Sequence, residues 1–252
     1  MKDPILVMRC LKRTLISISV CITAMMPYEC YSQDTRLDEL LSKEKRLKDW
    51  EEPRHQLVFS RDGIKMMDIR IPPGDTTDFH LHQHPSIGVI INPVSVQKQK
   101  YGEDWSAPTP NLSPQSRAWL KGYITGAEKQ LEIRENYHRV RNSDVETFHY
   151  VAIISTRKPK ETGSDAFQEH ENYWFRAKKV IVEAKQESTK QQFPNDVVVV
   201  QYLKGESDIL ENHVAHSTKT EPGAFSWHQK NAAFMIRNKS ESSLGFVLVE
   251  VK

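Results

Sequence analysis

Cysteine is confined to the start of this 252-residue sequence, where Cys10, Cys21 and Cys30 are its only three. A disulfide framework is therefore excluded for the remainder, whose stability must come from a buried core. Long apolar runs are also missing. The longest, Thr14 to Met26, has 13 residues, whereas a membrane-spanning helix needs about 20.

The first 32 residues have the layout of a secretory signal. A basic segment (Arg9, Lys12 and Arg13) precedes the apolar run, and Cys30-Tyr31-Ser32 offers a small-any-small cleavage site. We predict a signal peptide over 1–32 and a secreted or periplasmic mature chain. The alternatives are an uncleaved anchor, which Pro27 disfavours, a lipoprotein at Cys30, and a start at Met8.

The mature chain also lacks an excess of either charge. The signal holds four of the 35 Lys and Arg residues and two of the 33 Asp and Glu residues, so 31 of each sign remain. Nothing therefore indicates binding to nucleic acid or, after signal removal, to a membrane. The remaining 220 residues suit one large β domain or two small ones.

Strand patterns dominate the chain after Pro53. An amphipathic helix is expected before it, over 33–52, because Leu37, Leu40 and Leu41 lie among charges. Asp62-Gly63 predicts a hairpin turn, and the Pro- and Gly-rich segment 98–136 predicts a long loop with a short helix near its middle. Strands are expected at 55–59, 64–71, 79–84, 86–92, 137–142, 148–154, 173–184, 197–203, 224–227, 233–238 and 244–251.

The pattern of residues indicates one β unit that is used twice. Segments 138–154 and 234–250 each have a strand ending in Arg-Asn, a five-residue polar turn and an apolar strand. Upstream of them, 84–91 resembles 193–200. Two matched pieces in the same order predict an internal repeat.

Three histidines stand on alternate positions in the segment Pro72 to Pro85: His80, His82 and His84. This spacing does not suit a helix face, but it places side chains on one face of a strand. Such imidazoles either bind a ligand or lie in water. By contrast, we expect no separate site among His213, His216 and His228, which lie in polar segments.

These residues resemble the motifs of the cupin superfamily. Gly74 is followed by five residues and then His80-Leu81-His82, as in the first cupin motif, and His138 stands four residues before Asn142, as in the second. The resemblance implies an all-β fold of two cupin-like double-stranded β-helix (jelly-roll) barrels, a bicupin, with a short N-terminal helix. The barrels would span 53–158 and 173–252, joined by a linker at 159–172.

The resemblance also implies a metal site in the first barrel alone. His80, His82 and His138 would hold one divalent transition metal (Fe, Mn, Ni, Cu or Zn), which suits imidazole ligands. The sequence departs from the motif because the glutamate position falls on Ser86 or Ile87. His84 is a candidate fourth ligand or proton carrier in its place. In the second copy Phe234 occupies the histidine position, which predicts a metal-free barrel.

Alternatives remain at these positions. His80 and His82 could be solvated, His138 could be a core residue, and Asn142 is expected to cap a turn. For function we expect a metal-dependent enzyme, of dioxygenase or isomerase kind, acting on a small organic molecule. The alternatives are a non-catalytic barrel that binds a small ligand and a structural barrel that forms a homodimer.

Overall fold

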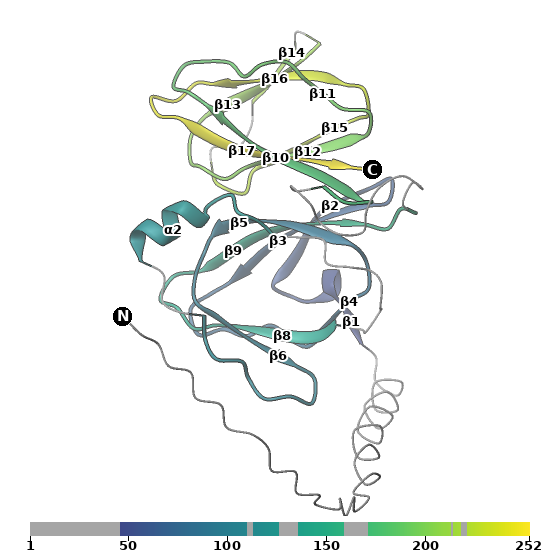
Figure 1. Cartoon of the computed structure of the whole chain (residues 1–252), viewed down its shortest axis with the longest axis vertical. Helices are drawn as coiled ribbons and strands as arrows, with labels where there is room; N and C mark the ends of the chain where they lie inside the picture. The colour runs from purple at the N-terminus through teal and green to yellow at the C-terminus, as the bar shows by residue number, and fades with distance from the viewer. Residues whose placement is uncertain (1–45, 110–112, 126–135, 159–170, 213, 218–220) are drawn as a thin grey trace, which may run out of the picture. The chain divides into compact units, whose positions relative to one another are not determined.

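The computed structural model describes residues 46–109, 113–125, 136–158, 171–212, 214–217 and 221–252 (Figure 1). The predicted signal 1–32 and most of the helix predicted over 33–52 lie outside these residues. The described end of that helix is different from the prediction. Leu47–Lys48 is a short strand, β1, and Asp49–Glu51 is a 3-10 helix, η1, because β1 pairs with β4 and the Glu51 carboxylate accepts from the Lys48 N–H.

The N-terminal sandwich consists of two sheets. One has the strand order β2-β3-β9-β5-β7 and the other β1-β4-β8-β6. The predicted hairpin joins β2 and β3, and both of its turn residues, Asp62 and Gly63, have positive φ, as a two-residue hairpin turn requires. The strands are His55–Arg61 (β2), Ile64–Ile71 (β3), His80–His82 (β4), Ser86–Asn92 (β5), Val96–Lys100 (β6), Ile124–Thr125 (β7), Asn136–Asn142 (β8) and Phe148–Ser155 (β9).

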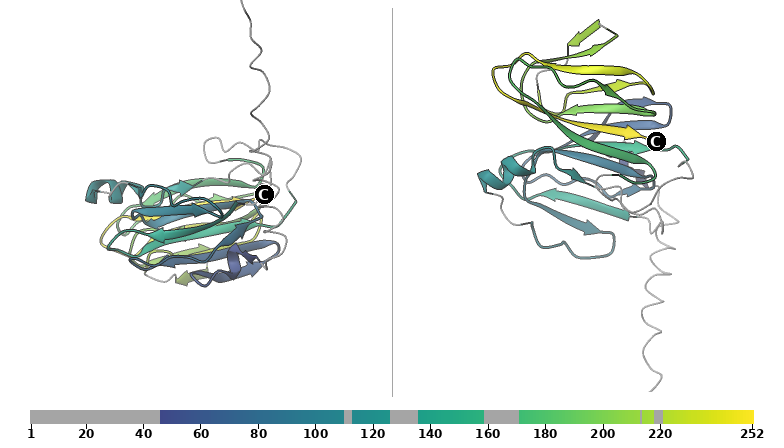
Figure 2. Two further views of the ribbon diagram at one scale, coloured as in Figure 1. Left: turned by 90° about the horizontal axis from the view of Figure 1, so that it is seen from below. Right: turned by 45° about the horizontal axis from the view of Figure 1, so that its top comes forward.

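The C-terminal sandwich also consists of two sheets, of four strands each. Their orders are β10-β17-β12-β15 and β11-β16-β13-β14, and Figure 2 shows the layers of strands from two further directions. The strands are Phe175–Val182 (β10), Gln191–Gln192 (β11), Asp196–Gln201 (β12), Ser207–Glu211 (β13), Val214–Ser217 (β14), Phe225–His228 (β15), Ala233–Asn238 (β16) and Leu244–Val251 (β17).

The described residues of the segment 98–136, predicted as a loop, carry more regular structure than expected. Strand β6 pairs with β8, and β7 pairs with β5. The short helix is present as α2, Pro114–Leu120, which begins after Ser113, whose hydroxyl accepts from the Ser116 N–H. β6 and β7 have little strand pattern in their own sequence, and they form because they pair with β8 and β5. No helix of the described residues is both long and apolar enough to cross a membrane.

The two sandwiches repeat one topology. The order β3-β9-β5-β7 matches β10-β17-β12-β15, and β4-β8-β6 matches β11-β16-β13. The buried Asn142 and Asn238 occupy equivalent turns. The side-chain amide of Asn142 donates to the carbonyls of Ile71 and Glu146, and that of Asn238 donates to those of Val182 and Ser242. Asn142 therefore holds its turn, as predicted.

Successive side chains of a buried strand enter two different cores, because the sheet is covered on both faces. In β12, Val197 and Val199 belong to the interior of the C-terminal sandwich. Val198 and Val200 belong to a cluster that also contains Met66 and other residues of the N-terminal sandwich. The valine run of β12 therefore serves two cores at once.

Candidate metal centre

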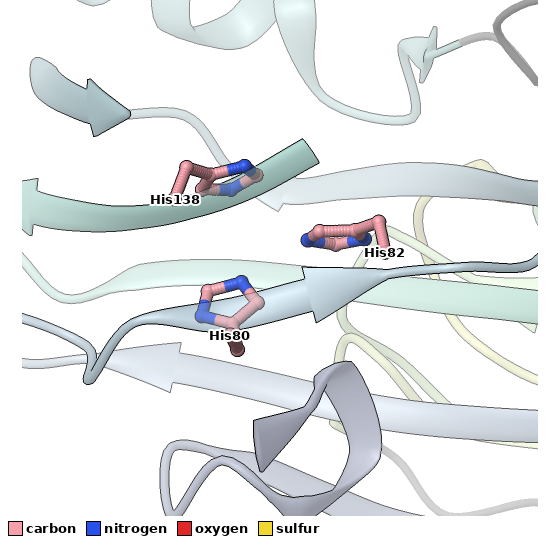
Figure 3. Close-up of side chains that lie close together, drawn as sticks. All are labelled: His80, His82 and His138. Atoms are coloured by element: carbon pink, nitrogen blue, oxygen red, sulfur yellow. The ribbon is translucent and has the colours of Figure 1, made fainter. Parts of the chain in front are cut away.

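Three of the predicted ligands lie together inside the N-terminal sandwich. Strands β4 and β8 are antiparallel neighbours, and their register places His80 directly opposite His138. The ring centroids of His80, His82 and His138 are 4.8–4.9 Å apart in all three pairs, and their ligand atoms lie within 4.8 Å of one another (Figure 3). This arrangement could hold one metal ion.

Two of these rings are prepared for a metal, one by a hydrogen bond and the other by burial. The Nδ1 of His80 lies 2.9 Å from the carbonyl oxygen of Asp78, which only accepts, so Nδ1 donates and Nε2 keeps its lone pair. The Nδ1 of His82 lies 3.6 Å from a carboxylate oxygen of Asp49. Its Nε2 is buried and has no hydrogen-bond partner among the described residues. An orphaned buried nitrogen beside two other imidazoles fits a metal ligand.

A carboxylate that belongs to neither histidine motif, that of Asp49, lies next to His82. Asp49 is 1 % exposed, because β1 runs parallel to β4 and carries η1 alongside it. One carboxylate oxygen accepts from the Trp50 N–H at 3.0 Å, and the other, Oδ2, has no hydrogen-bond partner in the described structure. Burial raises the pKa of Asp49 to about 7. Asp49 therefore supplies an acidic group at the site from outside the histidine motifs.

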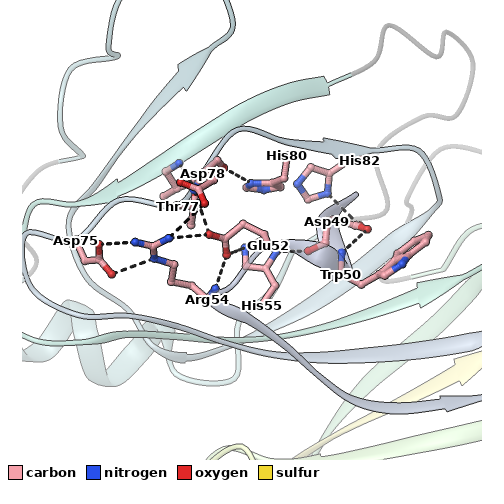
Figure 4. A network of polar contacts seen from close by, with 11 residues as sticks. Asp49, Trp50, Glu52, Arg54, His55, Asp75, Thr77, Asp78, His80 and His82 are labelled. Atoms are coloured by element: carbon pink, nitrogen blue, oxygen red, sulfur yellow. Dashed lines mark hydrogen bonds and ion pairs between the residues drawn. The ribbon is translucent and has the colours of Figure 1, made fainter. Parts of the chain in front are cut away.

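A second buried carboxylate, Glu52, holds the segment that leads into β4 (Figure 4). It accepts from the Asp78 N–H at 3.1 Å and from the Arg54 N–H at 2.6 Å. The Arg54 side chain bonds Glu52 and, through two nitrogens, Asp75. Since the Asp78 carbonyl orients His80, this network fixes the His80 ring through the backbone.

His55 is a fourth imidazole at the site. Its ring meets that of His80 edge-on, with centroids 4.5 Å apart, and its Nδ1 lies 2.7 Å from the carbonyl oxygen of Asp49. It stands outside the cluster of three whose ligand atoms converge. Neither His55 nor Asp49 belongs to the histidine motifs of the sequence, so only the structure shows that they lie at this site.

The structure does not bring His84 into the cluster. Strand β4 ends at His82, so the alternation that aims His80 and His82 inward does not continue to His84. Its ring instead stacks on Trp50 with centroids 5.5 Å apart. That the three clustered histidines bind a metal stays a prediction, and His84 is not one of the group.

Burial keeps the imidazoles of the cluster neutral. It lowers the pKa of His55 and of His138 to about 3, with the neighbouring His80 acting in the same direction. It also lowers the pKa of His80, and that of His82 well below its usual value. A neutral imidazole is the form that binds a metal, so the site is ready for one at pH 7.

The metal-free protein is expected to lose stability as the pH falls from 6.5 to 4.5. In this window the unfolded chain protonates its histidines. In the folded chain burial lowers the pKa of His55, His80, His82 and His138, so the unfolded state binds more protons. Burial raises the pKa of Asp49 and Glu52. These two carboxyl groups therefore stabilise the folded state as the pH falls, but they are outnumbered by the four histidines. The net loss is on the order of a few kcal/mol.

Urea midpoints of the metal-free protein at pH 7, 5.5 and 4.5 measure this loss. Other carboxylates titrate at or below the lower end of this window, so they contribute mainly near pH 4.5. The variant His138→Phe should reduce the slope of the unfolding free energy by about 1.4 kcal/mol per pH unit, because it removes one such histidine. A midpoint that does not move between pH 7 and 4.5 would contradict the burial of the cluster.

The equivalent place in the C-terminal sandwich has no such cluster. Gln191 and Phe234 are opposite one another there, as His80 and His138 are in the N-terminal sandwich. No second group of converging metal ligands exists among the described residues. His228 lies inside this sandwich, 5 % exposed and stacked on Phe234 with centroids 4.2 Å apart, although it belongs to a polar segment of the sequence.

Comparison with known proteins gives a fold but no relative in sequence. No family model matches the chain, and no curated protein matches it. AerE from Microcystis aeruginosa matches in structure with a TM-score of 0.52 at 11% identity, covering 80% of this chain and 98% of AerE. Salicylate 1,2-dioxygenase from Pseudaminobacter salicylatoxidans matches with a TM-score of 0.52 at 9% identity, covering 87% and 82%.

A mutant of Bacillus subtilis oxalate decarboxylase also matches. Its TM-score is 0.51 at 8% identity, and the match covers 75% of this chain and 69% of the decarboxylase. Identities this low show a shared fold and nothing more. The chain has the β-sandwich fold of the cupin proteins.

Proposed function

We propose that this chain is a secreted, metal-dependent enzyme that acts on a small organic acid. The observation that carries the proposal is the convergence of His80, His82 and His138, with the Nε2 of His82 buried and unpartnered among the described residues. Three protein ligands leave coordination positions open to a substrate, which is the arrangement of catalytic rather than structural sites. A divalent transition metal bound there would supply Lewis-acid or redox chemistry.

The residues around the site favour an anionic substrate. Lys100 stands opposite His138 in the register of β6 and β8, and Lys98 stands opposite Val140. Directly opposed residues of antiparallel strands share a face, so both lysines lie on the face that carries His138. Their positive charges help to lower the pKa of His138. The same charges would attract a carboxylate toward the site.

The structural neighbours support the same substrate class. Two of them are by name a dioxygenase for salicylate and a decarboxylase for oxalate, and both names denote small organic acids. The isomerase reaction considered from the sequence has no such support. We therefore favour oxygen-dependent ring cleavage or decarboxylation, with the second sandwich as a metal-free partner of the first in a bicupin.

Turnover of small acids tests this function. The chain, loaded in turn with Fe(II), Mn(II), Ni(II), Cu(II) and Zn(II), would be offered aromatic and aliphatic carboxylic acids beside their neutral amides, with oxygen uptake and product masses recorded. We expect turnover of an acid but not of its amide, and loss of that turnover in His138→Phe. Turnover that survives both metal removal and this substitution would refute the proposal. Stoichiometric metal with acid binding but no turnover would instead support a ligand-binding barrel.

A further inference from the structure

The C-terminal sandwich contains a cavity of about 460 Å³ that the proposed metal enzyme does not use. It lies among β13, β14 and β15, and β15 is the edge strand of its sheet. Its size is within the range of pockets that bind small molecules. Both polar and apolar side chains line it, among them Ile209, Glu211, His216, Pro222, Ser226 and His228.

Three of the lining residues form a chain of hydrogen bonds. The Nδ1 of His228 lies 2.7 Å from Oε2 of Glu211, and the Nε2 of His228 lies 2.8 Å from the Ser226 hydroxyl. An ionised carboxylate only accepts, so Nδ1 carries the proton and Nε2 of the neutral ring accepts from the serine. This is the order of contacts that activates a serine nucleophile: serine to base, and base to an orienting carboxylate.

The fold holds this chain of bonds in place. Ser226 and His228 are two residues apart on β15, opposite Val199 and Val197, which point into the core of the C-terminal sandwich. Both side chains therefore face the same interior. Phe234 stacks on the His228 ring at an interplanar angle of 18°, which fixes the plane of the imidazole. Phe234 occupies the position that His138 has in the N-terminal sandwich. The interior of the C-terminal sandwich therefore contains the Ser226–His228–Glu211 chain in place of the histidine cluster.

The protonation of His228 suits a general base. Burial lowers its pKa, and the neighbouring Glu211 acts in the opposite direction without reversing the shift. The ring is therefore neutral at pH 7 and can accept a proton from Ser226. In the unfolded chain the serine and the glutamate would have no such common partner.

We propose that Ser226, His228 and Glu211 form a second active site, in which the serine hydrolyses small carboxylic esters. The Ser226 oxygen adds to the ester carbonyl carbon while its proton passes to Nε2 of His228. The bond to the alcohol oxygen then breaks, and the alcohol leaves with that proton. Water next attacks the acyl-serine and gives a proton to His228. The carboxylic acid is released, and Ser226 recovers the proton from His228.

Two probes test this site in the full-length chain. An alkyl fluorophosphonate reports a reactive serine by covalent labelling, which peptide mass spectrometry assigns to a residue. Hydrolysis of p-nitrophenyl acetate reports turnover, and its good leaving group makes acylation easy to detect. We expect labelling on Ser226 and an ester hydrolysis rate that Ser226→Ala lowers by at least about 100-fold.

Matched variants separate the site from background reactions. Ser242→Ala, at an exposed serine in the β16–β17 turn, should leave labelling and hydrolysis unchanged. Glu211→Gln should lower both without abolishing them, because the base stays but loses its charged partner. Metal removal and His138→Phe should change neither, which separates this activity from that of the N-terminal sandwich. Hydrolysis that persists in Ser226→Ala, or a wild-type protein that takes no label on Ser226, would overturn the proposal.

Discussion

Replacing His138 with phenylalanine is expected to lower the affinity for the transition metal by more than about 100-fold. Loss of a partner that only orients a ligand costs 10- to 100-fold, and loss of a ligand itself should cost more. The variant should still fold, because Phe234 occupies the equivalent position of the C-terminal sandwich and is fully buried there. Titration against a chromophoric chelator measures the affinity, and the metal-induced rise in melting temperature should disappear with it.

His84→Phe is the matched control for that experiment. The aromatic ring can keep the stacking contact with Trp50, and the residue stands outside the cluster. Its affinity should stay within about threefold of the wild type, a change of less than 1 kcal/mol. If His84→Phe weakened binding as much as His138→Phe did, the assignment of ligands would be wrong. Equal metal affinity in the wild type and both variants would contradict a metal site at these histidines.

Replacing Asp49 with asparagine is expected to lower metal affinity by about 10- to 100-fold. The carboxylate lies 3.6 Å from Nδ1 of His82, so it favours the tautomer whose Nε2 faces the other two imidazoles. Asparagine has the same shape but no charge, and it can turn either an oxygen or an amide toward the ring. A chelator competition series on both proteins measures the difference.

Stability separates this positioning role from a purely structural one. Asp49 is buried with one oxygen unpartnered in the described structure, and such a group is costly to bury. The metal-free Asn variant should therefore be as stable as the wild type or more so, while its metal affinity falls. Glu51→Gln, an exposed acid in the same 3-10 helix, should leave affinity unchanged. A loss of stability in Asp49→Asn without a loss of affinity would contradict the role.

Much of the fold was accessible from local pattern. The bounds predicted for β3, β5, β16 and β17 are those of the structure, because these strands are apolar runs between clear turn residues. The spacing of His80 and His82 correctly placed both on one strand. The duplicated Arg-Asn turns also proved equivalent, since Asn142 and Asn238 make the same kind of bonds.

The parts that could not be predicted depend on pairing between distant segments. Asp49 reaches the site only because β1 pairs in parallel with β4, whereas the leucine pattern before it predicted a helix. Strands β13 and β14 have little apolar alternation and exist as neighbours of β16 and of each other. The hydrogen bond of His228 with Glu211 joins β15 to β13, and the sequence of neither strand predicts this contact.

Metal content of the chain purified without chelator tests the central claim most directly. Elemental analysis of the wild type, His138→Phe and His84→Phe, each at known protein concentration, gives the number of metal ions per chain. We predict close to one transition-metal ion in the wild type and in His84→Phe, and close to none in His138→Phe. A wild-type chain that holds no transition metal, even after incubation with each candidate ion, would contradict the account.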